Sequence, residues 1–273
     1  MFWRSRRIRS VGTNVMESAI GHSVTDYTTV DCTKNKGKVI EMKNLNKVNT
    51  EELRKDYGEI NDTINTNEYH EFESKEEVEL WGKKKFAEWA SNHKKMFQLT
   101  LKYGNPLLHL ADPADMYFGD KHSVINKALR KETAYDSVPR DIVSCTGNLM
   151  MAILSAPVID EKVVLYKQVS KKMVKKLVEY NKKGVPYLEK GFLSTSMVKE
   201  CCANNCGSSK YMLKIYVDDY TPIHAIFANA IRVRSEEELL LPPKMYMRMV
   251  KYPYVDEGTG KIVYEVCLIN MVW

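Results

Sequence analysis

The 273-residue chain lacks a long hydrophobic run, a glycine- or proline-rich repeat and a strong excess of charge of one sign. Its longest apolar stretch, residues 148–159, contains Ser155 and Pro157 and is shorter than the ~18 residues of a membrane-spanning helix. The 13 glycines and 9 prolines are too few for a fibrous or low-complexity protein. A net charge of +6 is mild for this length and does not indicate nucleic acid as the partner. We therefore expect a globular protein with no membrane span.

The six cysteines lack the spacing of a disulfide framework, so we interpret them as reduced thiols. Cys201, Cys202 and Cys206 form a cluster without a C-x-x-C pair, and His224 is the nearest imidazole after them. A metal site at this cluster is the less favoured alternative. We predict no metal and interpret residues 197–210 as a loop.

The N-terminal residues 1–60 are polar, with lysines separated by Asn, Thr and Gly, which is typical of an arm or extension. Arginines at positions 4, 6, 7 and 9 open the chain, but no apolar segment follows them, so a conventional secretory signal is not expected. A short basic arm of this kind is more often solvated than bound to phosphate or a membrane surface.

Residues 61–160 are predicted to be a mainly helical lobe. Ser74 and Glu77 have the spacing of a capping box, so a helix is expected to start there, with an aromatic-rich face after it. Further helices are predicted over residues 123–131 and 141–154, where apolar residues recur at helical spacing.

Residues 161–273 are predicted to be rich in β-strands. A short strand at 163–166 and a helix ending at Gly184 come first. Strand-like segments then follow at residues 192–196, 211–217, 223–228, 236–241, 245–250 and 262–269. Helices first and strands later favour an α+β domain with a mainly antiparallel sheet.

Three segments carry residues suited to chemistry: 165–167, 191–196 and 235–242. Each alone is more typical of an ordinary polar strand or a solvated turn. In an extended chain, however, alternate side chains share a face, so Glu236 and Glu238 would place two carboxylates side by side. Such a pair suits cleavage of a glycosidic bond, because an anion stabilises the oxocarbenium-like transition state.

In this order and spacing the three segments resemble the arginine-serine-glutamate class of mono-ADP-ribosyltransferase toxins, especially the Rho-modifying exoenzymes and the enzymatic components of actin-modifying binary toxins. The resemblance covers most of residues 61–273 and includes the helix that starts near Ser74. Asn126 and Arg130 lie in a stretch similar to the Y-x-x-I-N-x-x-L-R element of the class, with His122 in the place of its tyrosine. It implies the β-sandwich core of the ADP-ribosyltransferase fold.

The resemblance also implies roles for catalytic residues. Glu238 matches the glutamate that binds the nicotinamide-ribose 2′-hydroxyl and stabilises the oxocarbenium. Glu236 matches the first acidic residue of the E-x-E pair, which goes with arginine as the acceptor, whereas glutamine there would have implied an asparagine-type target. Ser194 matches the serine whose hydroxyl helps to hold the catalytic glutamate, and Val233 stands where an aromatic residue is usual.

By the same resemblance, NAD is the substrate, held by Lys167 with Tyr166, by Thr195 and Ser196 on the next strand, and by Asn126 and Arg130 of the helical lobe. Lys167 replaces the arginine of the class. Because an ammonium lacks the planar fork of a guanidinium, we expect weaker or differently oriented NAD binding. Residues 197–210 also lack an obvious aromatic and arginine pair to hold nicotinamide and phosphate.

The resulting hypothesis is a toxin or effector that transfers ADP-ribose from NAD to an arginine of a host protein, with actin or a small GTPase as the partners that the class suggests, and with some NAD hydrolysis. We expect delivery to the host cytoplasm by a route without a classical signal peptide. The alternative is a catalytically degenerate binding module of this fold. A nucleic-acid binder, resting on the N-terminal arginines and on Lys171, Lys172, Lys175 and Lys176, is the least favoured reading.

Overall fold

The computed structural model describes residues 42–47, 49–61, 64–103, 112–132, 137–205, 208–220, 222–232 and 235–269. Some residues of the sequence analysis lie outside these ranges: the N-terminal arginines, two of the six cysteines (Cys32 and Cys206), and Val233. None of the described helices is long and apolar enough to cross a membrane.

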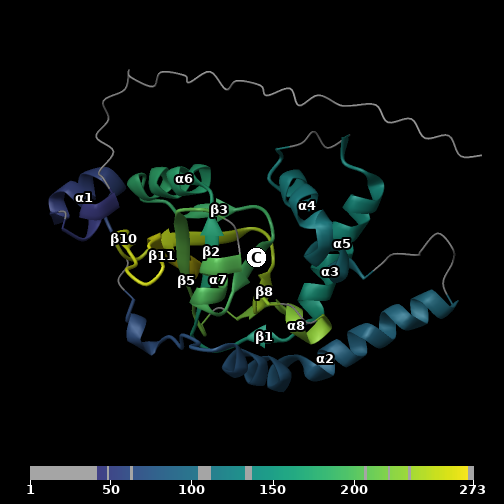
Figure 1. The fold of residues 1–273 in the computed structure, drawn as a ribbon. Coiled ribbons are helices and arrows are strands. Elements are labelled where there is room, and N and C mark those ends of the chain that lie inside the picture. Colours follow the sequence, from purple (N-terminus) through teal and green to yellow (C-terminus); the bar gives the residue numbers. More distant parts are fainter. Residues whose placement is uncertain are drawn as a thin grey trace, which may run out of the picture. The chain divides into compact units, whose positions relative to one another are not determined.

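Residues 40–273 make one compact unit, in which helices α1 to α5 precede the first strand and α6, α7 and α8 lie among the strands (Figure 1). The α-helices are α1 (Thr50–Tyr57), α2 (Lys75–Tyr103), α3 (Pro113–Met116), α4 (His122–Leu129), α5 (Arg140–Ser155), α6 (Lys171–Lys182), α7 (Lys199–Asn205) and α8 (Ala228–Ile231). A π-helical turn, Tyr117–Lys121, joins α3 to α4. The strands are β1 (Val158–Ile159), β2 (Val163–Val169), β3 (Tyr187–Glu189), β4 (Leu193–Ser196), β5 (Tyr211–Val217), β6 (Ile223–His224), β7 (Ile226–Phe227), β8 (Glu238–Leu241), β9 (Met245–Met249), β10 (Tyr254–Val255) and β11 (Ile262–Ile269).

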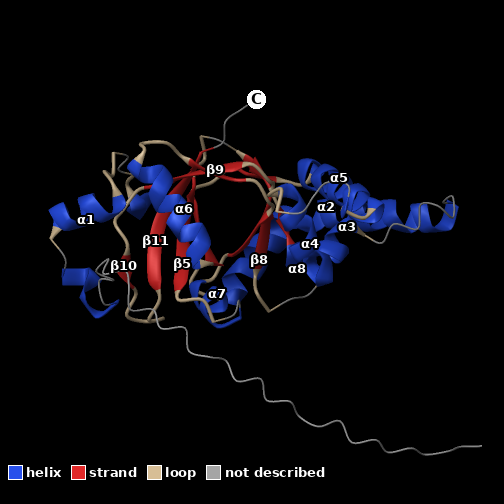
Figure 2. Cartoon of the chain, turned by 90° about the horizontal axis from the view of Figure 1, so that it is seen from above, coloured by secondary structure: helices blue, strands red, loops and turns tan. Residues whose placement is uncertain are grey.

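Nine of the described strands form one sheet, in which neighbours follow the order β3-β9-β11-β5-β2-β4-β8-β7 and β10 pairs with β11 at the side (Figure 2). Only the β5–β11 pair in that sheet is parallel; the other pairs are antiparallel. Strands β1 and β6 make a separate antiparallel pair. The prediction of an α+β fold with a mainly antiparallel sheet is therefore confirmed.

The sheet has apolar side chains on both faces near β8, and this decides where the two lobes meet. Leu239 and Leu241 join the main core, which also contains side chains of β2, β3, β5, β9 and β11. Leu240, between them, points the other way and packs with residues of α3, α4 and α5. Figures 1 and 2 both show these three helices gathered beside β8. The helical lobe thus lies directly against the β8–β7 end of the sheet.

The predicted capping box starts α2. The Ser74 hydroxyl accepts from the Glu77 N–H at 3.2 Å, and the Glu77 carboxylate in turn accepts from the Glu73 N–H at 3.0 Å. The buried face of α2 then packs on the end of the sheet, where Trp81 and Phe86 surround the ring of Phe227. This contact fixes α2 next to α8.

Two segments differ from the predicted loops. Residues 50–57 form α1, capped by Asn49, and its apolar residues Leu53 and Tyr57 pack on the main core. Residues 199–205 form α7, in which the side chains of Cys201 and Cys202 are buried. Both helices are short, and each packs on the core through only two residues, partly buried in α1 and buried in α7, so their periodicity is too brief to be read from the sequence.

Candidate active site

Almost all of the predicted site residues line one cavity of about 310 Å³ at the junction of the sheet and the helical lobe. It is bounded by residues of β2, β4, the turn before β8, and the stretch from 117 to 126. Predicted residues in its lining are Asn126, Tyr166, Lys167, Ser194, Thr195, Ser196, Glu236 and Glu238. Arg130 lies in an adjoining cavity instead.

Strand register brings the central residues together. In the antiparallel pair β4–β8, Ser196 is opposite Glu238, and in β2–β4 Tyr166 is opposite Ser196. Adjacent strands lie about 4.8 Å apart, so residues that are 30 and 42 positions apart in the sequence become neighbours. Glu238 is only 4% exposed, and it is the first residue of its strand.

The two carboxylates share the cavity for a reason other than the predicted one. Strand β8 begins at Glu238, and Glu237 has φ +45°, in the left-handed region that is unusual for a residue other than glycine. Glu236 therefore stands on a turn rather than in a strand. The cavity lining still includes both Glu236 and Glu238, whereas Glu237 is buried and accepts from Asn229 Nδ2 at 2.9 Å. Burial raises the pKa of Glu237.

Hydroxyl groups of β4 hold the backbone of this turn and strand. Ser196 Oγ donates to the Glu236 carbonyl at 2.7 Å and is also 3.0 Å from the Val198 carbonyl, and Thr195 Oγ1 donates to the Leu239 carbonyl at 2.7 Å. Both side chains were predicted to bind NAD. Their hydroxyls bond to backbone carbonyls and so position the Glu236–Glu238 turn, while both residues also line the cavity, and their contact with NAD stays a prediction.

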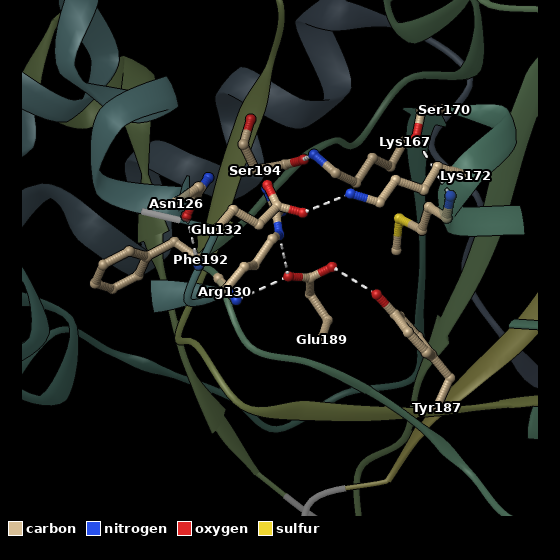
Figure 3. A network of polar contacts seen from close by, with 12 residues as sticks. Asn126, Arg130, Glu132, Lys167, Ser170, Lys172, Tyr187, Glu189, Phe192 and Ser194 are labelled. Carbon is tan, nitrogen blue, oxygen red and sulfur yellow. Dashed lines mark hydrogen bonds and ion pairs between the residues drawn. The ribbon is translucent and has the colours of Figure 1, made fainter. Parts of the chain in front are cut away.

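Lys167 reaches across from β2 to β4, where its Nζ donates to the Ser194 carbonyl at 2.5 Å (Figure 3). Burial lowers the pKa of Lys167, while the charges of Glu238 and Glu189 oppose that shift. The neighbouring Tyr166 donates its hydroxyl to Glu71, a carboxylate that also accepts from Lys214 Nζ at 2.6 Å. The phenol of Tyr166 is thus engaged with Glu71.

Asn126 ties α4 to the start of β4. Its Oδ1 accepts from the Phe192 N–H at 2.8 Å, and its Nδ2 donates to the Tyr117 hydroxyl at 3.0 Å. A Cβ at Gly191 would lie 2.8 Å from Asn126 Oδ1, so only glycine allows this close approach. In Figure 3 Asn126 lies beside Phe192.

Sequence reasoning missed an aromatic wall of the cavity. Tyr117 and Phe118 line it from the π-helical turn, and burial, together with the charge of Glu238, raises the pKa of the Tyr117 hydroxyl. The resemblance places an aromatic partner of nicotinamide within residues 197–210, which contain none. The signal available was the Tyr-Phe pair just before His122, close to the recognised Asn126.

A second cavity of about 290 Å³ adjoins the first, and Lys167 and Gln168 line both. Here Arg130 Nε donates to Glu189 Oε1 at 2.8 Å, and the same oxygen accepts from the Gly191 N–H at 2.7 Å (Figure 3). Burial lowers the pKa of Arg130, but the charge of Glu189 outweighs it, so the guanidinium stays protonated. Ser170, which caps the N-terminus of α6, also lines this cavity.

No group of His, Cys, Asp or Glu side chains is arranged to hold a metal ion within the described ranges. The arrangement offers instead two carboxylates in one cavity and a cation, Lys167, between that cavity and the next. It suits a long substrate whose reacting carbon lies near the carboxylates and whose anionic part extends past the lysine.

Comparisons with known proteins identify the family and the fold. A family model described as ADP-ribosyltransferase exoenzyme matches residues 78–270. Plx2a, an ADP-ribosyltransferase toxin from Paenibacillus larvae, is similar over 74% of this chain and 100% of its own, with 18% identity and a TM-score of 0.56. The C3 exoenzyme of Clostridium limosum covers 74% and 98%, with 18% identity and a TM-score of 0.53. A search of curated protein sequences found no match.

A further similar structure is BECa, an ADP-ribosylating toxin of a C. perfringens binary enterotoxin, solved with NADH. It is 17% identical, with a TM-score of 0.54, and the match spans 74% of this chain but 50% of BECa. At such identities, the likeness to solved structures shows a shared fold and leaves the assignment of substrate to the site.

Proposed function

The chain belongs to the ADP-ribosyltransferase exoenzyme family, as the motifs indicated, and we propose that it is an NAD-dependent mono-ADP-ribosyltransferase acting on an arginine of a host protein. The observation that carries the proposal is the meeting of Glu236, Glu238 and Ser194 in one cavity at the sheet–helix junction. Their grouping is what cleavage of a glycosidic bond and transfer of the sugar require.

In this proposal Glu238 accepts a hydrogen bond from the 2′-hydroxyl of the nicotinamide ribose. The bond between C1′ and the pyridinium nitrogen breaks, its electron pair leaves with nicotinamide, and the carboxylate of Glu238 stabilises the positive charge that develops on the sugar. Because Glu238 is nearly buried, its charge acts with little screening by water.

Glu236 directs the acceptor. A guanidinium nitrogen of the target arginine attacks C1′, and Glu236 takes the proton that this nitrogen loses. Half-buried on its turn, Glu236 is more accessible than Glu238, which suits a group that must meet a protein side chain. When water enters in place of arginine, the product is free ADP-ribose.

Lys167 binds the phosphates of NAD in this proposal. It lines both cavities, so a dinucleotide with its nicotinamide ribose near Glu238 would pass its pyrophosphate beside Lys167 and extend toward Arg130 and the N-terminus of α6. Backbone N–H groups and the dipole at that helix end favour an anion. The target is a protein of a host cell, with actin and small GTPases as candidates, reached after delivery to its cytoplasm.

One observation favours a second candidate, a degenerate binding module of the same fold. The Nζ of Lys167 already donates to the Ser194 carbonyl, and the hydroxyls of Thr195 and Ser196 bond to backbone, which leaves fewer polar groups for NAD than the predicted set. A module of this kind would bind a partner without releasing nicotinamide.

Nicotinamide release from labelled NAD tests the proposal. The wild-type protein should release nicotinamide, and Glu238→Gln should reduce the rate by at least about 100-fold, since it removes transition-state charge stabilisation. Glu257→Gln, at an exposed residue that lines neither cavity, is the matched control and should retain the wild-type rate. Equal release from wild type and Glu238→Gln would remove the assignment, and a wild type that binds NAD without releasing nicotinamide would favour the binding module.

The acceptor is tested separately with Glu236→Gln. We expect labelling of protein in a host-cell lysate to fall at least about tenfold more than NAD hydrolysis does, because the lost base acts on the incoming arginine. Chemical identification of the labelled side chain would then show the linkage. Parallel losses in both assays, or a linkage to a residue other than arginine, would overturn the acceptor role of Glu236.

A further inference from the structure

Glu132 stands at the second cavity, fixed there by the way α4 ends. The helix closes with a Schellman motif: the Glu132 N–H donates to the Lys127 carbonyl at 2.9 Å and the Lys131 N–H to the Ala128 carbonyl at 3.0 Å. Lys131 takes the left-handed conformation of this motif, with φ +56°. Two backbone bonds therefore fix where the Glu132 side chain starts.

The second cavity has more cations than carboxylates in its lining. Arg130, Lys167, Lys172 and Lys176 contribute positive charge, and Glu132 and Glu189 contribute negative charge. Glu189 is 1% exposed, and its carboxylate accepts from Arg130, the Gly191 N–H and the Tyr187 hydroxyl. It is committed to the protein, so Glu132 is the carboxylate of this lining that a ligand can reach.

Glu132 holds Lys172 across the cavity. Its Oε1 lies 3.1 Å from Lys172 Nζ, and Figure 3 shows the pair spanning the space between Arg130 and the start of α6. The hydrogen bond from Lys172, with further help from the charge of Arg130, lowers the pKa of Glu132, so the carboxylate is ionised at neutral pH. The side chain of Glu132 remains 36% exposed.

We propose that Glu132 makes this site selective for NAD over NADP, an inference that rests on the proposed function. If the nicotinamide ribose lies near Glu238, the shared lining of Lys167 and Gln168 directs the adenosine end into the second cavity. A carboxylate there accepts a hydrogen bond from the 2′-hydroxyl of the adenosine ribose, as acidic residues do in dinucleotide-binding folds. It repels a 2′-phosphate, which carries a charge of roughly −1.5 to −2.

Glu132 also withholds Lys172 from a 2′-phosphate. A 2′-phosphate would need cations, and Lys172 is a cation at the same place, but its charge is matched by Glu132 while the pair is closed. Neutralising Glu132 would remove the repulsion and release Lys172 to the phosphate. Both changes act on NADP and leave NAD, which has a hydroxyl at this position, nearly unaffected.

The test compares dissociation constants of NAD and NADP for full-length wild type and Glu132→Gln by calorimetry at low ionic strength. Gln keeps an acceptor oxygen but loses the charge. We expect Glu132→Gln to bind NADP about 10-fold more tightly than wild type, with the Kd of NAD changed less than about threefold. The gain should shrink at 0.5 M salt, where charge effects over this distance are screened.

Two further variants separate the causes. Glu179→Gln removes the same charge from an exposed pair on α6, whose carboxylate is 2.6 Å from Lys183 and lies outside both cavities, and should leave the ratio of the two Kd values at the wild-type value. The double variant that carries both Glu132→Gln and Lys172→Gln should lose most of the gain in NADP affinity seen with Glu132→Gln alone.

The outcomes distinguish the inference from the function beneath it. If wild type binds NAD and Glu132→Gln leaves the NAD-to-NADP ratio unchanged, or if Glu179→Gln shifts it equally, the role of Glu132 is wrong while the proposed function stands. If wild type binds neither dinucleotide and releases no nicotinamide, both are overturned.

Discussion

Gly82 brings α2 close to Phe227 of β7, and replacing this glycine with alanine tests how α2 is held. A Cβ at this position would lie 2.1 Å from Cε1 and 2.3 Å from Cδ1 of Phe227, far inside any real contact distance. Phe227 is 2% exposed and packs against Trp81 and Phe86, so its ring has little room to move. We expect Gly82→Ala to destabilise the protein.

The magnitude follows from two opposing effects. Alanine stabilises a helix interior by about 1 kcal/mol relative to glycine. Forcing a methyl group into a packed core costs about 1–3 kcal/mol, and a contact this short belongs at the upper end. The net loss for Gly82→Ala is therefore about 2 kcal/mol.

Gly147 in α5 provides the matched control, because a Cβ there meets nothing within 4 Å and the residue is exposed. Gly147→Ala should stabilise the protein by up to about 1 kcal/mol, so the same substitution changes the free energy of unfolding in the opposite direction. Urea denaturation of both variants and wild type measures the difference.

A double-mutant cycle with Phe227→Leu tests the cause. The smaller side chain should cost stability alone but relieve part of the clash in the Gly82→Ala background, giving a favourable coupling of at least about 1 kcal/mol. A Gly82→Ala protein as stable as wild type, or a cycle without coupling, would refute the reasoning that this ring blocks a methyl group.

Two further predictions concern charged residues of the cavities. Burial lowers the pKa of Lys167 below the unfolded value of 10.5, so between those two pKa values the native state binds fewer protons than the unfolded chain. The contribution of Lys167 to stability therefore rises with pH in that range. The affinity of the protein for NAD falls over the same range, because Lys167 loses its charge. Titration of NAD from pH 7 to 10 should show weakening binding in wild type and a flatter profile in Lys167→Arg, which stays charged; identical profiles would contradict the assignment. Glu189→Gln leaves Arg130, whose side chain is 31% exposed, without its anion, and should cost about 2 kcal/mol in urea denaturation; an unchanged midpoint would show that the pair does not hold the end of α4 to β3.

Much of the sheet could be predicted because the buried side chains of its strands form apolar patterns in the sequence. In β5, Leu213, Ile215 and Val217 alternate with Met212 and Tyr216, and all of these side chains are buried. Such a strand can be recognised from the sequence because buried apolar side chains lie on both of its faces. The start of α2 could be predicted from Ser74 and Glu77, because a capping box depends on local contacts alone.

The elements that could not be predicted depend on partners distant in the sequence. Helix α1 has a strongly charged sequence, and it is held by packing of Leu53 and Tyr57 and by the bond from Asn181 Nδ2 to the Tyr57 carbonyl, 2.9 Å long. Nothing near residue 57 indicates that contact. The strand predicted over residues 223–228 is divided into β6 and β7 and ends where α8 starts at Ala228.

For the candidate site, motif spacing grouped residues that line one cavity, but it could not supply their orientation. Thr195 and Ser196 were assigned to a ligand, yet their hydroxyls bond to the Leu239 and Glu236 carbonyls. Tyr117 was missed because its place in the lining depends on the π-helical turn, which the sequence does not announce. The arginine acceptor and the roles of the two glutamates remain predictions.

The left-handed conformation of Glu237 separates a bend that carries Glu236 from a paired strand that carries Glu238. Glu238 belongs to a strand with partners on both sides, β4 and β7, whereas Glu236 is carried by the bend that precedes it. Under the proposed roles, substitutions around the bend would alter the choice of acceptor protein without disturbing cleavage of the dinucleotide. Acceptor specificity could then change in evolution while the carboxylate proposed to stabilise the oxocarbenium stayed in place.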